Sequence, residues 1–194
     1  MGDGPADGAP PDADHAARRG RRRRRVLIAI GLVVVVFAAV TARVFVWPAL
    51  PRLPARADAI IELGGQGARD GKALELARAG RAPVLVQSTV ESEDGTDVCL
   101  PPVPDVTILC FHPDPDTTRG EARYIGRMAA QFHWKSVILV TTPDQAVRAK
   151  LRVSRCFSGD IYVSTTPLPK RDWVRQIPYQ WAAMARALTL ETSC

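Results

Sequence analysis

Short apolar runs alternate with helical segments between residues 57 and 194, and this alternation limits the possible folds more than any other feature of the sequence. The runs have the length of strands and carry few charges, and they cover residues 58–65, 82–89, 105–111, 136–142 and 160–166. Segments with the apolar period of a helix cover residues 68–80, 117–134, 143–157 and 173–190. Nearly continuous apolar strands are typical of a parallel sheet that helices cover on both faces. The sequence therefore predicts an α/β fold, a Rossmann-like three-layer sandwich with a mostly parallel sheet of about five strands.

An uncharged apolar segment stands in front of this α/β part. Residues 26–42 hold no charged side chain, and continuation to Trp47 gives a transmembrane helix over residues 26–47, because a span needs about 17 to 25 apolar residues. The alternative is a cleaved signal peptide that ends at Ala42. Seven arginines precede the segment. The positive-inside rule then predicts a single-pass protein of the plasma membrane, with a cytoplasmic N-terminus and a C-terminal domain outside the cytoplasm.

The segments on either side of the predicted span differ in composition from the α/β part. Residues 1–25 are rich in Gly, Pro, Ala and charge, which predicts a disordered, basic cytoplasmic tail. Residues 48–56 hold three prolines and predict a stiff linker to the extracytoplasmic α/β domain at residues 57–194. Seven arginines against four aspartates in the tail supply half of the net charge of +6. The domain is thus only mildly basic, so we expect membrane lipids and not nucleic acid as partners.

All four cysteines follow the apolar segment, and an even number in an exported domain predicts two disulfides. Three pairings are possible. We favour Cys99 with Cys110, which closes a short loop, and Cys156 with Cys194, which ties the end of the sequence to the end of a helix. The rival interpretation is a metal site, but the sequence has no CxxC or CxxH spacing to support one. We expect neither a metal site nor a cofactor.

Glycines and threonines follow the predicted strands, at the sheet edge where open α/β sheets bind ligands. The glycine-rich turn at residues 64–67 can bring backbone N–H groups close to an anion, or it is only a tight strand-to-helix turn. Thr118 with Glu121, and Thr142 with Gln145, have the spacing of capping boxes, which would explain these residues without a ligand. The ligand-binding candidates at this edge are Gly64, Gly65, Thr118, Glu121, Thr141, Thr142 and Arg148.

Several segments together resemble the YdcF, SanA and ElyC family of envelope proteins. They are ADAIIELGG from residue 57, a helix with Arg69 and Leu76, APVLVQST from residue 82, DTTRGEA from residue 116, VILVTTPDQAVRA from residue 137 and VSTTPLP from residue 163. The resemblance covers nearly all of residues 57–170 and is most specific at residues 117–122 and 140–149. It implies a Rossmann-like domain, often tethered by one N-terminal span, with a role in envelope integrity and in peptidoglycan or lipid-carrier metabolism.

This chain differs from the family pattern at one residue that could transfer a proton. Many members have a histidine where this chain has Gln145, whereas Thr118 and Arg148 are kept. Glutamine cannot transfer a proton near neutral pH, so any acid–base work of the family histidine is lost here. The remaining catalytic candidates are His112, Glu121 and Asp144, and the alternative for His112 is an exposed loop histidine.

The main functional hypothesis is a membrane-anchored envelope protein that supports envelope integrity by binding an anionic envelope metabolite or a lipid-linked cell-wall precursor. The second hypothesis is a hydrolase or transferase that acts on phosphorylated envelope intermediates. The third is a non-catalytic module that recruits cell-wall machinery through arginines at helical spacing, namely Arg119, Arg123 and Arg127, and Arg148 and Arg152. The alternative for these arginines is a solvated helix face.

Overall fold

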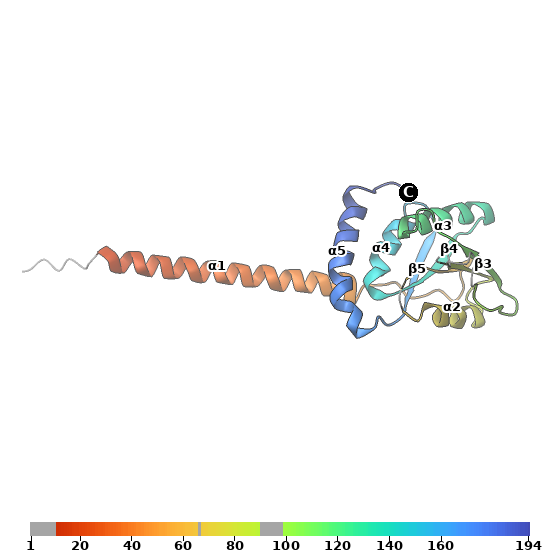
Figure 1. Ribbon diagram of the computed structural model, residues 1–194, viewed down its shortest axis with the longest axis horizontal. Helices are drawn as coiled ribbons and strands as arrows, with labels where there is room; N and C mark the ends of the chain where they lie inside the picture. The colour runs from red at the N-terminus through yellow and green to blue at the C-terminus, as the bar shows by residue number, and fades with distance from the viewer. Residues whose placement is uncertain (1–10, 66, 90–98) are drawn as a thin grey trace, which may run out of the picture. The chain divides into compact units, whose positions relative to one another are not determined.

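The computed structural model describes residues 11–65, 67–89 and 99–194, and the chain divides into two compact units, Met1–Thr41 and Ala42–Cys194 (Figure 1). The first unit contains helix α1, Pro11–Thr41. The stretch Arg18–Val46 is a helix long and apolar enough to cross a membrane.

Residues 11–25 are helical, which differs from the disorder that their composition predicts. The physical reason is that extending an existing helix costs far less than nucleating one, and Ala and Arg have high helix propensities. The apolar segment next in the chain therefore carries its helix back through the arginine run. Residues 1–10 of the predicted tail lie outside the described residues.

The second unit is built on a five-stranded, all-parallel sheet with the order β3-β2-β1-β4-β5. Its strands are β1 Ala59–Glu62, β2 Val84–Ser88, β3 Thr107–Phe111, β4 Ser136–Thr141 and β5 Asp160–Thr165. The central strands are buried on both faces, since Ile61 and Leu139 belong to one core cluster while Ile60 and Ile138 belong to the other. The predicted α/β, Rossmann-like fold is confirmed.

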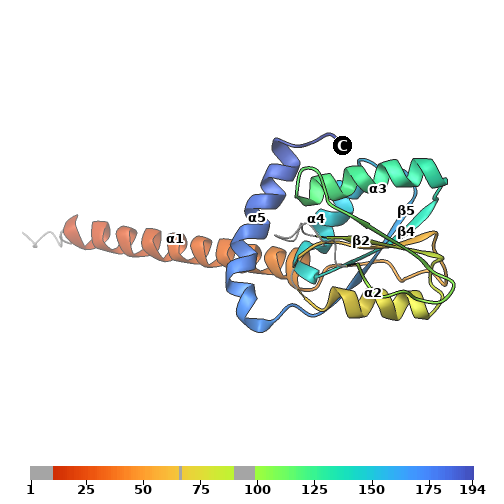
Figure 2. The ribbon, with the colours of Figure 1, turned by 45° about the vertical axis from the view of Figure 1, so that its right-hand side comes forward.

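Helices cover both faces of this sheet. Helix α2, Arg69–Arg78, lies on one face, and α3, Thr118–Phe132, with α4, Pro143–Val153, lies on the other (Figure 2). Helix α5, Trp173–Thr189, follows a single 3₁₀ turn, η2, at Lys170–Asp172, and packs against α4. The core between α3, α4 and the sheet includes Ile125 and Ala149, and the core under α2 includes Leu76.

The strand register shows which strand ends lie beside the end of β1. Glu62 at the end of β1 pairs with Gln87 in β2 on one side and with Val140 in β4 on the other. The chain runs from β1 to β2 and β3 in one direction, and continues with β4 and β5 on the opposite side of β1. The carboxyl ends of β1 and β4 therefore form the topological switch point, where doubly wound sheets bind ligands.

The folded unit begins before the predicted domain boundary at residue 57. A π-helical turn, η1, at Ala42–Val46 packs against α4, and its Phe45 is fully buried. In the predicted linker, Leu50 and Leu53 pack against the two core clusters, and Arg81 donates to the carbonyl oxygen of Pro54 at 2.9 Å. Residues 42–56 therefore belong to the folded unit and are not a free spacer. The proline content did not predict this, because prolines limit backbone hydrogen bonding but not side-chain packing.

Both predicted disulfides are present, and they leave none of the four cysteines free. Cys99 pairs with Cys110, which joins the segment before β3 to β3 itself. Cys156, just after α4, pairs with Cys194. Such bonds are typical of domains outside the cytoplasm.

Candidate functional site

A cavity of about 530 Å³ opens at the carboxyl edge of the sheet, near the switch point. Its walls come from the turn after β1, the end of β2 and the helices α3, α4 and α5. The polar side chains and glycines that line it include Gly64, Gly65, Arg69, Ser88, Thr118, Glu121, Thr142, Asp144, Gln145, Arg148, Tyr179 and Gln180. Six of the seven predicted ligand-binding residues are among them; Thr141 is completely buried and does not line the cavity.

Thr118 does not cap its helix as the sequence predicts. The N-cap of α3 is Thr117, whose hydroxyl accepts the N–H of Gly120 at 3.4 Å. The Thr118 hydroxyl instead accepts from Nη1 of Arg148 at 2.9 Å and from Nε2 of Gln145 at 3.1 Å. Thr118 therefore joins α3 to α4 at the floor of the cavity.

The predicted cap of α4 is also changed. Thr142 is the N-cap residue and Pro143 begins the helix, but the Thr142 hydroxyl makes no capping bond. It accepts from Nη2 of Arg69 at 3.1 Å, and Oε1 of Gln145 accepts from the same nitrogen at 3.0 Å. A helix cap contributes about 1 kcal/mol, whereas a buried guanidinium without acceptors costs more free energy than that. The Thr142 hydroxyl and the Gln145 amide therefore accept hydrogen bonds from Arg69 and do not cap the helix.

Arg69 lines the cavity, although the sequence placed it only in the family resemblance and not among the predicted site residues. Its Nη1 donates to the carbonyl oxygen of Leu63 at 2.7 Å and also to that of Gly64. With its bonds to α4, the guanidinium joins the turn after β1 to the start of α4. One sequence signal could have found it, since an arginine in the first turn of a helix opposes the helix dipole and needs a tertiary reason.

The glycine-rich turn at residues 64–67 meets a conformational requirement. Gly65 and Gly67 adopt φ values of 126° and 106°, which L-residues with a side chain rarely adopt. A Cβ on Gly65 would lie 3.1 Å from the guanidinium nitrogens of Arg69. The Gly64 N–H donates to Oε1 of Glu121 at 2.6 Å. The described part of this turn therefore has the tight strand-to-helix geometry, and one of its amides is held by the protein.

Arg148 lies deeper along α4 and is engaged differently from Arg69. Only 6% of the residue is exposed, and its Nε donates to Oε1 of Gln180 at 2.9 Å. Gln180 in turn donates from Nε2 to Oδ2 of Asp144 at 2.9 Å. Among the residues that the structure describes, Nη2 of Arg148 has no hydrogen-bond partner. Burial lowers the pKa of Arg148, against the nearby Tyr179 and Glu121, which raise it.

Glu121 is a buried acid in the wall of the same cavity. Burial raises its pKa, and the Gly64 amide, the Ser88 hydroxyl, Arg69 and Arg148 act in the opposite direction. Its carboxylate holds the glycine turn against α3. Glu121 therefore has a structural task at this point, and it does not close the capping box that its spacing from Thr118 predicts.

The three catalytic candidates do not all come together. Glu121 and Asp144 both line the cavity, but His112 is exposed and lies outside it, with Nδ1 3.2 Å from the carbonyl oxygen of Thr89. In the described parts of the chain, no group of three or more His, Cys, Asp or Glu residues could hold a metal ion. The cavity lining therefore combines the guanidiniums of Arg69 and Arg148 with the carboxyl groups of Glu121 and Asp144, and includes no histidine among the described residues.

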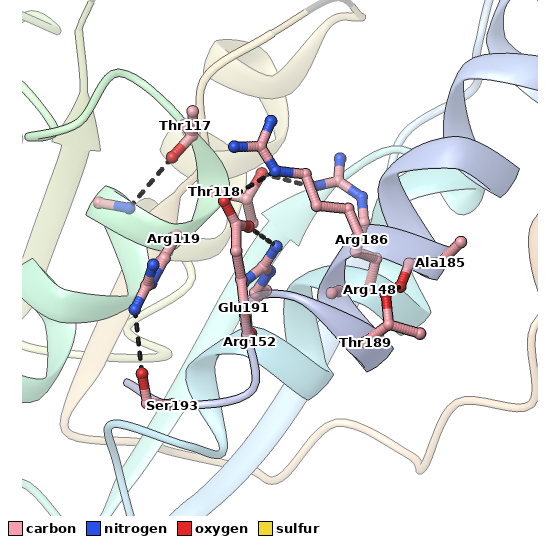
Figure 3. A network of polar contacts seen from close by, with 12 residues as sticks. Thr117, Thr118, Arg119, Arg148, Arg152, Ala185, Arg186, Thr189, Glu191 and Ser193 are labelled. Carbon is pink, nitrogen blue, oxygen red and sulfur yellow. Dashed lines mark hydrogen bonds and ion pairs between the residues drawn. The ribbon is translucent and has the colours of Figure 1, made fainter.

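The arginines at helical spacing largely contact the last residues of the chain (Figure 3). Arg119 donates to Oγ of Ser193 at 3.0 Å, and Arg119 and Arg123 both reach the carbonyl oxygen of Cys194. Arg152 pairs with Glu191, which also pairs with Arg186 at 2.8 Å. These arginines therefore do not form the free basic stripe that a recruitment surface would need, although Arg127 is exposed and lies 5.7 Å from the ring centre of Tyr124.

Comparison with protein-family models finds no match to this chain, and comparison with curated proteins finds none either. The resemblance to the YdcF, SanA and ElyC family therefore stays a prediction from the quoted motifs.

Proposed function

We propose that this chain is a membrane-anchored envelope protein whose folded unit binds an anionic ligand at the cavity beside β1 and β4. The ligand class is a phosphate-bearing envelope metabolite or lipid-linked cell-wall precursor. One observation carries the proposal: Arg148 is almost fully buried in the cavity wall, and among the described residues its Nη2 has no acceptor.

Electrostatics supports an anion at this position. The Arg148 guanidinium is largely removed from water, and this burial lowers its pKa. An anion at Nη2 would offset the cost through a charge-assisted hydrogen bond. The helices α3 and α4 both begin at the cavity, at Thr118 and Pro143, and the positive end of a helix dipole favours the same sign of ligand charge.

Binding is better supported than turnover. Gln145 occupies the place of the family histidine, and both ends of its amide are engaged, by Arg69 and Thr118. Glu121 holds the Gly64 amide, and one oxygen of Asp144 accepts from Gln180. The polar groups of the cavity therefore hold one another in fixed positions, which suits recognition of a ligand.

The membrane anchor is supported by the apolar helix and by the chain on either side of it. The arginines at positions 18–25 favour a cytoplasmic N-terminus. Phe45, four residues beyond the end of α1, is buried in the folded unit, so the domain starts directly where the apolar segment ends. Two disulfides agree with an extracytoplasmic domain.

The test is an Arg148→Met substitution in the full chain, purified in detergent, with exposed Arg78→Met on α2 as matched control. Calorimetric titration would use inorganic pyrophosphate and a short prenyl diphosphate, which separate a soluble from a lipid-linked source. Arg148→Met is expected to weaken binding at least about tenfold, because a charge-assisted hydrogen bond contributes roughly 1.5–3 kcal/mol. The control should bind like the parent. Unchanged affinity in a folded Arg148→Met variant, or no binding of either compound by the parent, would contradict the proposal.

A further inference from the structure

Helix α5 has two faces with different surroundings. Gln176, Tyr179 and Gln180 lie on one side and line the cavity. On the opposite side, Val174, Pro178, Trp181, Ala185 and Leu188 follow one another at spacings of four and three residues, which places them in one line along the helix. We call these five residues the apolar stripe.

The two ends of the apolar stripe are open to solvent. Val174 is 85% exposed and Leu188 is 56% exposed. The middle is covered, because the ring of Trp181 packs edge-on against the buried ring of Phe45 in η1, with ring centres 5.2 Å apart. Only the centre of the stripe is therefore used within the folded unit.

The position of Phe45, which covers the centre of the stripe, indicates which partner could cover the two ends. Phe45 belongs to the turn that continues directly from the apolar helix, so the chain leaves the folded unit for its membrane segment at the midpoint of the stripe. Val174 and Leu188 are each seven residues from Trp181, or about 10 Å along the helix. Both ends of the stripe are therefore near the residues that connect the folded unit to the apolar helix.

We infer that the apolar stripe of α5 lies on the surface of the bilayer and that its occupant is lipid. The neighbouring side chains agree with this partner. Trp47, just after η1, is 73% exposed, and tryptophan prefers the membrane interface. Lys170 and Arg171 in η2, at the start of α5, are exposed, and cationic side chains beside an apolar helix face favour anionic headgroups. The inference rests on the proposed membrane anchor, but not on the proposed ligand.

Single-cysteine labelling in the full chain tests this inference. All four native cysteines are in disulfides, so an introduced cysteine is the only free thiol. An environment-sensitive fluorophore would be placed at Val174→Cys and Leu188→Cys, with Arg78→Cys on α2 as the exposed control and Val34→Cys in the apolar helix as the reference for insertion. The protein would be reconstituted into vesicles of phosphatidylglycerol and phosphatidylethanolamine that contain nitroxide-labelled lipid. We expect quenching at positions 174 and 188 to be several-fold stronger than at position 78.

The outcomes separate the inference from the proposals on which it depends. Quenching at position 34 without quenching at 174 and 188 would overturn the stripe as a lipid contact and leave the anchor in place. Absence of quenching at position 34 would overturn both. Disulfide-linked dimers of unlabelled Val174→Cys in the vesicles would show a second copy of the chain on the stripe and would also overturn the inference.

A charged variant provides an independent readout. Val174→Asp combined with Leu188→Asp should strongly reduce the quenching of a label at Ala185→Cys, an exposed position of the stripe between the two substitutions. The same variant should bind pyrophosphate like the parent, because the stripe and the cavity are on opposite sides of α5. Unchanged quenching at position 185 would contradict a lipid contact through the stripe.

Discussion

Two buried arginines, Arg69 and Arg148, line the same cavity, and they differ in the number of hydrogen-bond acceptors that the protein provides for them. Arg69, 3% exposed, donates to two backbone carbonyls, a hydroxyl and an amide, and holds the turn after β1 against α4. Arg148, 6% exposed, donates to one hydroxyl and one amide. Nearly equal burial therefore hides a difference in hydrogen bonding. The number of acceptors that face each guanidinium is therefore the difference on which the proposed roles depend, a structural role for Arg69 and a ligand-binding role for Arg148.

The largest expected effect is on the structural side of this comparison. Arg69→Met would leave the acceptors of the β1 turn and of α4 without a donor, and would remove a positive charge beside buried Glu121. We expect the free energy of unfolding to fall by about 3–5 kcal/mol, measured by chemical denaturation of the full chain in detergent. Arg148→Met should lose less, roughly 1–3 kcal/mol, since fewer acceptors depend on it. Equal losses in the two variants would break the comparison.

The next effect concerns Glu62, the buried carboxyl group at the end of β1, which interacts with the charge of Arg69. Burial and a hydrogen bond with Asp70 raise the pKa of Glu62 to about 9, from an ordinary 4.5. Between these values the folded state binds a proton that the unfolded state does not, so the free energy of unfolding falls as pH rises through this window. The loss from pH 4.5 to pH 7 has an upper limit of roughly 3 kcal/mol, at about 1.4 kcal/mol per pH unit.

A Glu62→Gln variant should remove that pH dependence. The amide keeps a neutral group of the same shape, and its N–H can donate to Asp70 as the protonated carboxyl does. We expect the variant to be more stable than the parent above pH 5, with a gain that grows toward pH 9, in denaturation curves recorded over this range. The same dependence of stability on pH in the parent and in Glu62→Gln, between pH 5 and pH 9, would contradict the raised pKa of Glu62.

The smallest effect tests the turn that Arg69 holds. Gly65→Ala would place a Cβ against the Arg69 guanidinium at a φ value that alanine rarely adopts, and we expect a loss of about 1–2 kcal/mol in unfolding free energy. Gly71→Ala in α2 is the matched control, because a Cβ there meets nothing within 4 Å. It should stabilise the helix by roughly 0.5–1 kcal/mol. A Gly65→Ala variant as stable as the parent would show that the β1 turn is not specially constrained.

The binding measurement on Arg148 and the denaturation of the Arg69 variant together complete the comparison. If Arg69→Met retains a folded domain in detergent, any weakening of pyrophosphate binding should be indirect, through a displaced α4. The loss of affinity should then be smaller than the loss in Arg148→Met. A folded Arg69→Met that loses binding as completely as Arg148→Met would place both guanidiniums at the ligand.

Much of the architecture can be predicted from the sequence. Five nearly continuous apolar runs and the helical periods between them are enough to predict a parallel sheet with two covered faces, because strands buried on both faces cannot carry polar residues at alternate positions. The position of the candidate site at the carboxyl edge of the sheet also follows from this topology. The cysteine pairing was correctly predicted from loop length and position in the chain.

The role of each site residue was decided by tertiary structure. Thr118, Thr142 and Gln145 have the local spacing of helix caps, and local sequence cannot show that buried guanidiniums from other elements compete for their oxygens. The same limit explains why Arg69 was not among the predicted site residues and why the predicted linker packs into the core. The sequence by itself thus determined the elements and their order, since these depend on periodicity within short segments. Which polar groups meet depends on contacts between residues far apart in the chain, such as Arg69 with Gln145 and Arg148 with Gln180, and only the folded structure brings these together.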